Sequence, residues 1–230
     1  MTRVQIPILM KTLLSILSLT LLATIGAEPQ TNVLFLAVDD LRPELGCYGK
    51  KEILSPHIDE LAAQGTLFTR AYCQVAVCGA SRASLMTGLR PTWKRFLSYN
   101  TFAEKDAPGA MTVAEELKAS GYHCISNGKI FHHKGKGFHD EASFDDFQMM
   151  APQNMPPRKL NHAPEYGSRN TDWGVWPPDE RETIDFRTAD YCIKALQDPV
   201  KDKPLFLACG IFKPHSPFFA PKEYFEGLDE

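Results

Sequence analysis

The chain has 230 residues, with 25 basic and 28 acidic side chains, and its formal charge is −3 with neutral histidine. Apolar residues make up 43 % and charged residues 23 %, which are ordinary values for a globular protein. This composition excludes a disordered chain, a collagen-like repeat and a multi-span membrane protein. The slightly acidic balance gives no electrostatic reason to expect nucleic acid as a partner.

The first 27 residues differ in character from the rest of the chain. Arg3 and Lys11 are their only charged side chains, and residues 13–25 form an apolar run too short to span a bilayer comfortably. Small residues ending at Ala27 precede the first acidic residue. These features are typical of a secretory signal peptide. We therefore predict that residues 1–27 are cleaved and that the protein is exported without a stable membrane anchor; an uncleaved anchor is the alternative.

Predicted strands and helices alternate along residues 28–230. Apolar or extended runs predict strands at residues 32–38, 67–74, 122–126 and 204–212. Helical patterns cover residues 55–65, 81–87, 112–121 and 183–197. The first strand is apolar throughout, as is typical of a strand covered on both faces. The alternation predicts an α/β fold, in which chemistry gathers beyond the carboxyl ends of the strands.

Local signals mark several of the predicted boundaries. Ser55 is a candidate cap of the first helix, Thr112 and Glu115 form a capping box, and Gly88 ends the helix before it. Residues 134–182 are rich in Pro, Gly, Asn and Asp and have no clear period. So long an irregular stretch is usually a functional loop or an insertion.

Six cysteines are spread thinly along the chain, with no Cys-x-x-Cys pair and no zinc-type spacing. They do not predict a disulfide framework, even for an exported protein. Cys124 and Cys209 lie inside apolar strand-like runs and are predicted to be buried thiols.

Two adjacent carboxylates, Asp39 and Asp40, follow the first predicted strand. They repel each other, and a hard divalent cation with oxygen ligands would supply the counter-charge. The alternative is a turn in which one acid caps a backbone amide. Spacing alone favours the turn slightly.

Cys78 directly precedes a predicted helix, and Arg82 follows one turn later. Unpaired amides and the positive end of the helix dipole favour an anion at such a position, and the arginine could reach the same spot. A buried cysteine beside a surface arginine is the competing interpretation.

Basic residues also follow two later strands. Lys129 and His132 come after the strand at residues 122–126 and could hold an oxyanion and move protons. Lys213 and His215 flank a proline after the last strand. Each motif alone has another interpretation: Lys129 and His132 could belong to a basic surface loop, and His215 could be a structural histidine.

In their order along the chain, these motifs resemble those of the type I sulfatases. The motifs are Asp39-Asp40, Cys78-x-Ala80-Ser81-Arg82 with Thr87-Gly88, Gly128-Lys129-x-x-His132 and Lys213-Pro214-His215. Residues 38–49 and the Lys-x-x-His spacing look most like the iduronate-2-sulfatase branch. The resemblance covers about residues 31–226. It implies an alkaline-phosphatase-like, three-layer α/β/α fold with a mostly parallel sheet, of which this chain is the N-terminal part.

The resemblance also implies a nucleophile and a metal. Cys78 would be oxidised to formylglycine by a formylglycine-generating or other sulfatase-maturing enzyme. One hydroxyl of the hydrated aldehyde would attack the sulfate sulfur, and the other would later expel sulfate. Asp39 and Asp40 would hold one Ca²⁺, with residue 78 as a further ligand. Because the family's other calcium ligands lie in a part absent here, we expect residues 1–230 alone to bind calcium poorly.

The remaining site residues also follow from the resemblance. Arg82 would steady the formylglycine, Lys129 and His132 would contact the aldehyde hydrate and the sulfate, and His215 would bind the sulfate or protonate the leaving oxygen. The implied function is hydrolysis of sulfate esters on a sulfated carbohydrate such as a glycosaminoglycan. A phosphate or phosphonate ester hydrolase on the same scaffold is the first alternative. An inactive truncated fragment that acts at most as a binding domain is the second.

Overall fold

A computed structural model of the chain describes residues 31–132, 142–149, 154–161 and 171–226. The chain divides into two compact units, Met1–Thr31 and Asn32–Glu230, and the architecture below belongs to the second. The predicted signal peptide lies outside the described residues. Among the helices of the described ranges, none has the length and apolar character needed to cross a bilayer.

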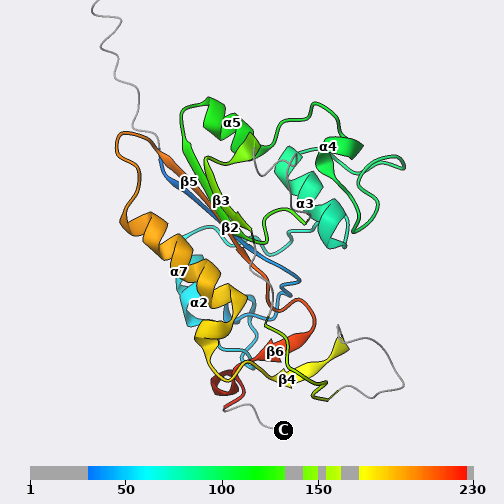
Figure 1. Cartoon of the computed structure of the whole chain (residues 1–230), viewed down its shortest axis with the longest axis vertical. Helices are drawn as coiled ribbons and strands as arrows, with labels where there is room; N and C mark the ends of the chain where they lie inside the picture. Colours follow the sequence, from blue (N-terminus) through cyan, green and yellow to red (C-terminus); the bar gives the residue numbers. More distant parts are fainter. Residues whose placement is uncertain (1–30, 133–141, 150–153, 162–170, 227–230) are drawn as a thin grey trace, which may run out of the picture. The chain divides into compact units, whose positions relative to one another are not determined.

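Four parallel strands form the main sheet, in the order β1-β5-β2-β3 (Figure 1). Their bounds are Val33–Val38 for β1, His123–Gly128 for β2, Asp146–Met149 for β3 and Leu205–Ile211 for β5. In the register, Val38 pairs with Ile211 and Gly128 pairs with Gly210. The carboxyl ends of β1, β5 and β2 therefore meet at one edge of the sheet.

Helices cover both faces of this sheet, so the unit has three layers (Figure 1). Met86 of α3 (Cys78–Thr87) and Ala114 of α5 (Val113–Ala119) pack with Phe206 on one face. On the other face, Cys192 of α7 (Ile184–Gln197) packs against Leu207 of β5. Burying these apolar side chains stabilises the layers by roughly 25 cal/mol for each Å² removed from water. The three-layer arrangement predicted from the resemblance is thus present.

Smaller elements complete the described part of the chain. They are α2 (Pro56–Gln64), α4 (Ala103–Asp106), the short helical turns η1 (Gly46–Tyr48), η3 (Glu180–Glu182) and η4 (Lys222–Tyr224), and a parallel pair of strands, β4 (Trp173–Val175) and β6 (Phe218–Ala220). The strand pair and η3 lie beyond the amino end of α7, and β6 and η3 help to form the cavity described below.

Most sequence predictions of elements are confirmed. Strands occur within or across residues 32–38, 122–126 and 204–212, and helices occur at 55–65, 112–121 and 183–197. The capping box is present: Thr112 Oγ1 accepts from the amide of Glu115, and the Glu115 carboxylate accepts from the amide of Thr112. Cys124 and Cys209 are buried thiols, as predicted.

Three predictions about local structure are wrong, and a fourth is confirmed only in part. Residues 67–74 contain no strand, and the helix expected at 81–87 begins three residues earlier, at Cys78. The stretch 134–182 is not irregular throughout, since it contains β3 and β4. Ser55 occupies the N-cap position of α2 as predicted, but its side chain makes no capping hydrogen bond; its hydroxyl accepts from the amide of Gly46 and donates to Asp59, which ties η1 to α2.

The expectation that the first strand is covered on both faces is also wrong for the described part of the chain. Leu34 is 54 % exposed and Leu36 is 49 % exposed. The reason is that β1 has β5 as its single partner in the described sheet, while α7 contacts β5 and β2. An apolar run therefore predicts a strand correctly, but it does not predict how much of that strand other elements cover.

Candidate active site

Three segments that carry predicted site residues leave the same edge of the sheet. Asp39 follows β1, Lys129 follows β2, and residues 213–215 follow β5 by one residue. The amide of Asp39 donates to the carbonyl of Ile211 at 3.0 Å, and the amide of Lys129 donates to the carbonyl of Gly210 at 2.8 Å. These bonds extend the parallel ladders by one residue, so both side chains start from a fixed backbone position.

Two glycines allow β2 and β5 to approach closely at this edge. A Cβ on Gly210 would lie 2.5 Å from the backbone nitrogen of Lys129. Gly128 has a positive φ of 82°, and a Cβ there would lie 2.8 Å from Cγ2 of Thr188 in α7. Both contacts are closer than any real Cβ tolerates. The absence of side chains at these two positions therefore determines where Lys129 leaves the sheet.

A buried ionic triad joins three of the predicted site residues. Arg82 Nη2 lies 3.0 Å from Oδ1 of Asp39, and Lys129 Nζ forms an ion pair with Oδ2 of the same carboxylate. Asp39 is 5 % exposed and Lys129 is 4 % exposed, and Arg82 is also buried. Both oxygens of one carboxylate are thus engaged by two cations away from bulk water, where the pairing is stronger than at a surface.

The triad lowers the pKa of its acid. Burial by itself would raise the pKa of the Asp39 carboxyl group, because it disfavours the charged form. The hydrogen bond from Lys129 and the charges of Arg82 and Lys129 outweigh that effect, so the pKa of Asp39 lies below its usual range. Asp39 is therefore ionised at neutral pH, and the three side chains carry a net charge of about +1.

Arg82 also fixes the backbone beside β2 through its second terminal nitrogen. Nη1 donates to the carbonyl of Ile130 at 3.0 Å and to the carbonyl of Lys129. Arg82 belongs to α3, and Cys78, half-buried, is the first residue of that helix, one turn earlier. Gly79 packs so closely on the carbonyl of Tyr99 that a Cβ there would collide with it. The residue predicted to be the nucleophile is therefore held one helical turn from the triad, at the positive end of the helix dipole.

His132 lies on the same side of α3. With Gly79, Arg82 and Phe102 it lines a small cavity, and its ring meets the ring of Tyr99 edge-on at 6.5 Å. This places His132 beside the first turn of α3.

His215 and Lys129 of the triad both approach the ring of Phe212. The ring of Phe212 is 4.7 Å from the His215 ring and 4.7 Å from Nζ of Lys129. His215 Nδ1 lies 2.6 Å from the carbonyl oxygen of Ser216. Because a carbonyl only accepts, Nδ1 carries the proton and Nε2 is the nitrogen that can take up another.

Asp185, in the first turn of α7, supports this loop and was not predicted as a site residue. Its carboxylate accepts from the amides of Phe212 at 2.6 Å and Lys213 at 2.8 Å. Burial raises the pKa of Asp185 despite those two donors. For Lys213, burial disfavours the charged form and lowers the pKa to about 8, although the negative charge of Asp185 acts in the opposite direction. One feature of the sequence could have identified Asp185. Thr183 is the N-cap of α7, and Asp185 follows two residues later, in the first turn of the helix.

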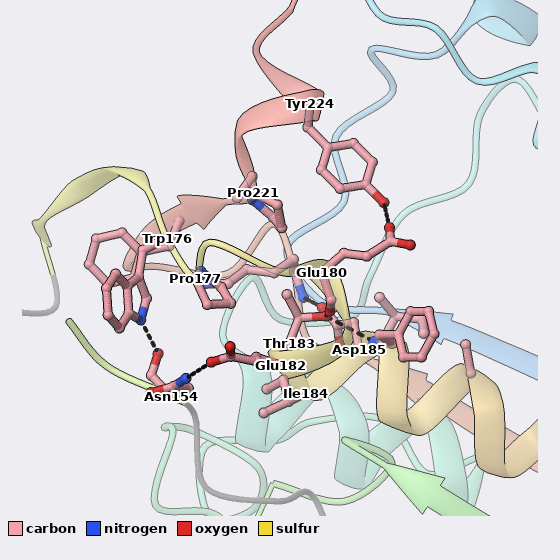
Figure 2. Close-up of a pocket in the computed structure, with 16 residues that line it drawn as sticks. Asn154, Trp176, Pro177, Glu180, Glu182, Thr183, Ile184, Asp185, Pro221 and Tyr224 are labelled. Atoms are coloured by element: carbon pink, nitrogen blue, oxygen red, sulfur yellow. Dashed lines mark hydrogen bonds between the residues drawn. The ribbon is translucent and has the colours of Figure 1, made fainter.

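A larger cavity of about 560 Å³ opens beside these supporting residues (Figure 2). It lies among α7, β6, η3 and η4, with Trp176 toward one end and Tyr224 toward the other. The Trp176 indole donates to the carbonyl of Asn154 at 3.0 Å, and the Tyr224 hydroxyl donates to Glu180 at 2.9 Å. The cavity reaches Asp185, but the triad residues do not line it.

The arrangement does not fit a divalent cation as it stands. Carboxylate oxygens are the right donors for Ca²⁺, but both oxygens of Asp39 already face cations. Asp40 is exposed, with a left-handed φ of 53°. Within the described ranges, no group of three or more His, Cys, Asp or Glu side chains could hold a metal ion. The structure thus brings Asp39, Arg82 and Lys129 together without forming the predicted calcium site.

Arg82 and Lys129 thus lie buried at the carboxyl edge of a three-layer α/β/α sheet, and Cys78 begins the helix that carries Arg82. This is where ligand sites gather in α/β folds. Comparison with known proteins identifies the family. The family model described as Sulfatase matches residues 31–228, and the chain belongs to the sulfatase family. Members of this family generally depend on formylglycine and Ca²⁺.

Two curated relatives and one solved structure illustrate the similarity. Human iduronate 2-sulfatase is 34 % identical over 222 residues, which cover 87 % of this chain and 39 % of that protein. A sulfatase of Formosa agariphila is 32 % identical over 210 residues, covering 85 % and 41 %. A crystal structure of an alkaline phosphatase superfamily protein from Vibrio parahaemolyticus has a TM-score of 0.58 at 21 % identity, covering 89 % of this chain and 46 % of that one.

These comparisons confirm the predicted alkaline-phosphatase-like α/β fold and the predicted family. The chain spans about two fifths of the length of both curated relatives. The activity, substrate and partners of the whole protein are therefore matters for proposal.

Proposed function

We propose that the protein containing this chain hydrolyses sulfate esters of a sulfated carbohydrate, with residue 78 as the nucleophile after conversion to formylglycine. The observation that carries the proposal is the convergence of Arg82 and Lys129 on the edge of the sheet, one helical turn from Cys78. Family membership and the name of the human relative, which refers to sulfate removal from iduronate, support the substrate class.

The side chains around residue 78 suit an anion that develops further negative charge. Lys129 and Arg82 supply two cations in a buried setting, and buried cations stabilise transition-state charge more strongly than solvated ones. Arg82 is anchored by the carbonyls of Lys129 and Ile130, so it would hold residue 78 in place without having to be ordered at the moment of reaction.

The two histidines have roles suited to their positions. His132, beside the first turn of α3, would contact the sulfate or the nucleophile. His215 would bind the sulfate or, when protonated at Nε2, donate a proton to the leaving alcohol oxygen. If residue 78 is converted to formylglycine, it would supply a hydrated aldehyde with two hydroxyl groups on one carbon, a nucleophile beside Arg82 that an ordinary serine could not provide.

Two partners belong to this proposal. The first is a formylglycine-generating or other sulfatase-maturing enzyme, which would oxidise Cys78. The second is a sulfated glycan, which the protein would meet if it is exported as residues 1–27 predict. Ca²⁺ also belongs to it, with Asp39, Asp40 and residue 78 among its ligands and further ligands from outside the described residues. Since Asp39 as arranged is occupied by two cations, no chemical step is derived through the ion.

Turnover of matched aryl esters tests the proposed reaction. The full-length protein, co-expressed with a maturing enzyme, should hydrolyse an aryl sulfate faster than the corresponding aryl phosphate. Cys78→Ala should abolish turnover, and Cys73→Ala, at an exposed free cysteine, should leave it unchanged. Preference for the phosphate would favour the phosphoryl or phosphonate alternative. Glycan binding without turnover of either ester would favour the non-catalytic binding domain.

A further inference from the structure

The carboxylate of Asp185 holds the loop after β5 rather than the helix to which it belongs. Thr183 already caps α7, because its hydroxyl accepts from the amide of Phe186. The Asp185 oxygens accept instead from two consecutive amides, those of Phe212 at 2.6 Å and Lys213 at 2.8 Å. Each oxygen meets one donor, so the two charge-assisted bonds fix both the position and the direction of the chain where it leaves β5.

The Lys213 side chain holds the same loop from the other end. Its ammonium donates to the carbonyl of His215 at 3.0 Å and to the carbonyl of Pro217. It also lies 5.3 Å from the ring of Phe212 and 5.8 Å from the ring of Phe219. The amide of His215 donates in turn to the carbonyl of Phe212 at 3.1 Å. The charge of Lys213 is therefore used to shape the loop that carries the histidine.

This held backbone determines where the imidazole of His215 lies. Its ring centre is 4.7 Å from that of Phe212, and the Phe212 ring is also 4.7 Å from Nζ of Lys129. Asp185 binds the amide of the same phenylalanine. A shift of that amide would therefore move the ring against which both His215 and Lys129 pack.

We propose that Asp185 is a positioning residue for His215: together with the Lys213 ammonium, its carboxylate fixes the loop 212–217 and so holds the imidazole at the proposed sulfate site. This inference rests on the proposed function, in which His215 contacts the sulfate or the leaving oxygen, and it deepens that function. Asp185 touches no reacting group, since its oxygens are bound to loop amides. Its contribution is the placement of another side chain, and a misplacement of about 1 Å can cost about 10²-fold in rate.

Steady-state kinetics of the full-length, matured protein with an aryl sulfate tests the placement. Asp185→Asn keeps the shape of the side chain but turns one acceptor into an NH₂ donor, so at least one loop amide loses its partner. Its kcat/KM should fall by about 10²-fold. Asp185→Glu keeps both acceptors and should lie between this variant and wild type. Asp190→Asn is the matched control, because Asp190 is exposed on the same helix and pairs with Lys194; it should equal wild type.

A double-mutant cycle separates positioning from a general structural role. In a His215→Asn background, Asp185→Asn should cost less than about twofold more, because no imidazole is left to place. Losses that multiply as if the two sites were independent would overturn the proposal. So would a loss in Asp185→Asn that only follows the unfolded fraction measured by thermal unfolding.

The NMR signal of the His215 ring supplies a readout that does not need turnover. In histidine-labelled protein this signal is the one missing from His215→Asn, and the nearby Phe212 ring shifts it. It should move in Asp185→Asn and in Asp185→Glu, and stay in place in Asp190→Asn. A signal that stays in place in both Asp185 variants would overturn the positioning role.

Failure of this inference is distinguishable from failure of the proposed function. An active wild type with an equally active Asp185→Asn would overturn the positioning role and leave sulfate ester hydrolysis standing. An inactive wild type in which the His215 signal still moves on replacement of Asp185 would overturn the proposed function and leave the placement of the imidazole standing.

Discussion

Arg82 should be the most costly of the triad side chains to replace, because it joins three segments of the chain at once. Its guanidinium contacts the carboxylate after β1 and two carbonyls after β2, and its backbone belongs to α3. Arg82→Met keeps most of the length and apolar volume of the side chain but removes every donor. Two buried carbonyls then lose a donor, and Asp39 keeps Lys129 alone as a counter-ion.

The size of the effect follows from the burial of the groups left behind. Removing one partner of a buried charge pair typically costs about 3–5 kcal/mol, because the remaining groups stay desolvated without compensation. Whole domains are stable by about 5–15 kcal/mol, so this loss is a large fraction of the total. With a urea dependence of about 2–3 kcal/mol per molar, the unfolding midpoint should fall by roughly 1–2 M.

Urea unfolding followed by tryptophan fluorescence measures this shift. Arg181→Met is the matched control, because Arg181 pairs with Asp179 on the exposed surface, where an ion pair contributes little. Its midpoint should equal that of wild type. If Arg82→Met also unfolded within about 0.2 M of wild type, the triad would not hold these three segments together, and the reasoning from its burial would be wrong.

Three further predictions follow from the same edge of the sheet. Gly210→Ala places a Cβ 2.5 Å from the Lys129 nitrogen, so it should destabilise the fold by about 1–3 kcal/mol in urea unfolding; an unchanged midpoint would contradict the close approach. Because the pKa of Asp39 is lowered on folding, its ionised form contributes stability above its unfolded pKa, near 4, and loses it as pH falls through the folded pKa. The stability difference between wild type and Asp39→Asn should therefore shrink on acidification below about pH 4, and a pH-independent difference would contradict the shift. Burial lowers the pKa of Lys213 to about 8, so NMR of its ε-carbon should show titration near pH 8. Because the unfolded chain keeps this proton to a higher pH, the fold should gain stability as pH rises from about 8 toward the usual lysine pKa. Titration at the usual lysine value would contradict the burial of this side chain.

Elements that depend on local signals were predictable from the sequence. The capping box at Thr112, the helical pattern at residues 183–197 and the apolar run of β5 act over a few residues, and the structure contains each. The placement of Asp39 and Lys129 at strand ends also predicted that these two side chains would lie at one edge, because parallel strands bring their carboxyl ends together; Arg82, on α3, was expected there from the resemblance. Asp39, Arg82 and Lys129 do meet there.

Features that depend on distant parts of the chain were not predictable. The start of α3 at Cys78 has no capping side chain, since Val77 precedes it, so pattern alone placed the helix too late. The role of Asp185 depends on a contact across 27 and 28 residues of sequence. The pairing of Lys129 with Asp39 depends on the distance between the ends of β1 and β2, which no local pattern encodes.

The chemical state of residue 78 tests the central claim most directly. We would isolate the peptide containing this residue from protein co-expressed with a sulfatase-maturing enzyme and examine it by mass spectrometry after hydrazide labelling. An aldehyde at position 78, labelled by the hydrazide, with Cys73 still a thiol in the same preparation, is the predicted result. An unmodified thiol at position 78 in protein that nevertheless hydrolyses sulfate esters would contradict the account.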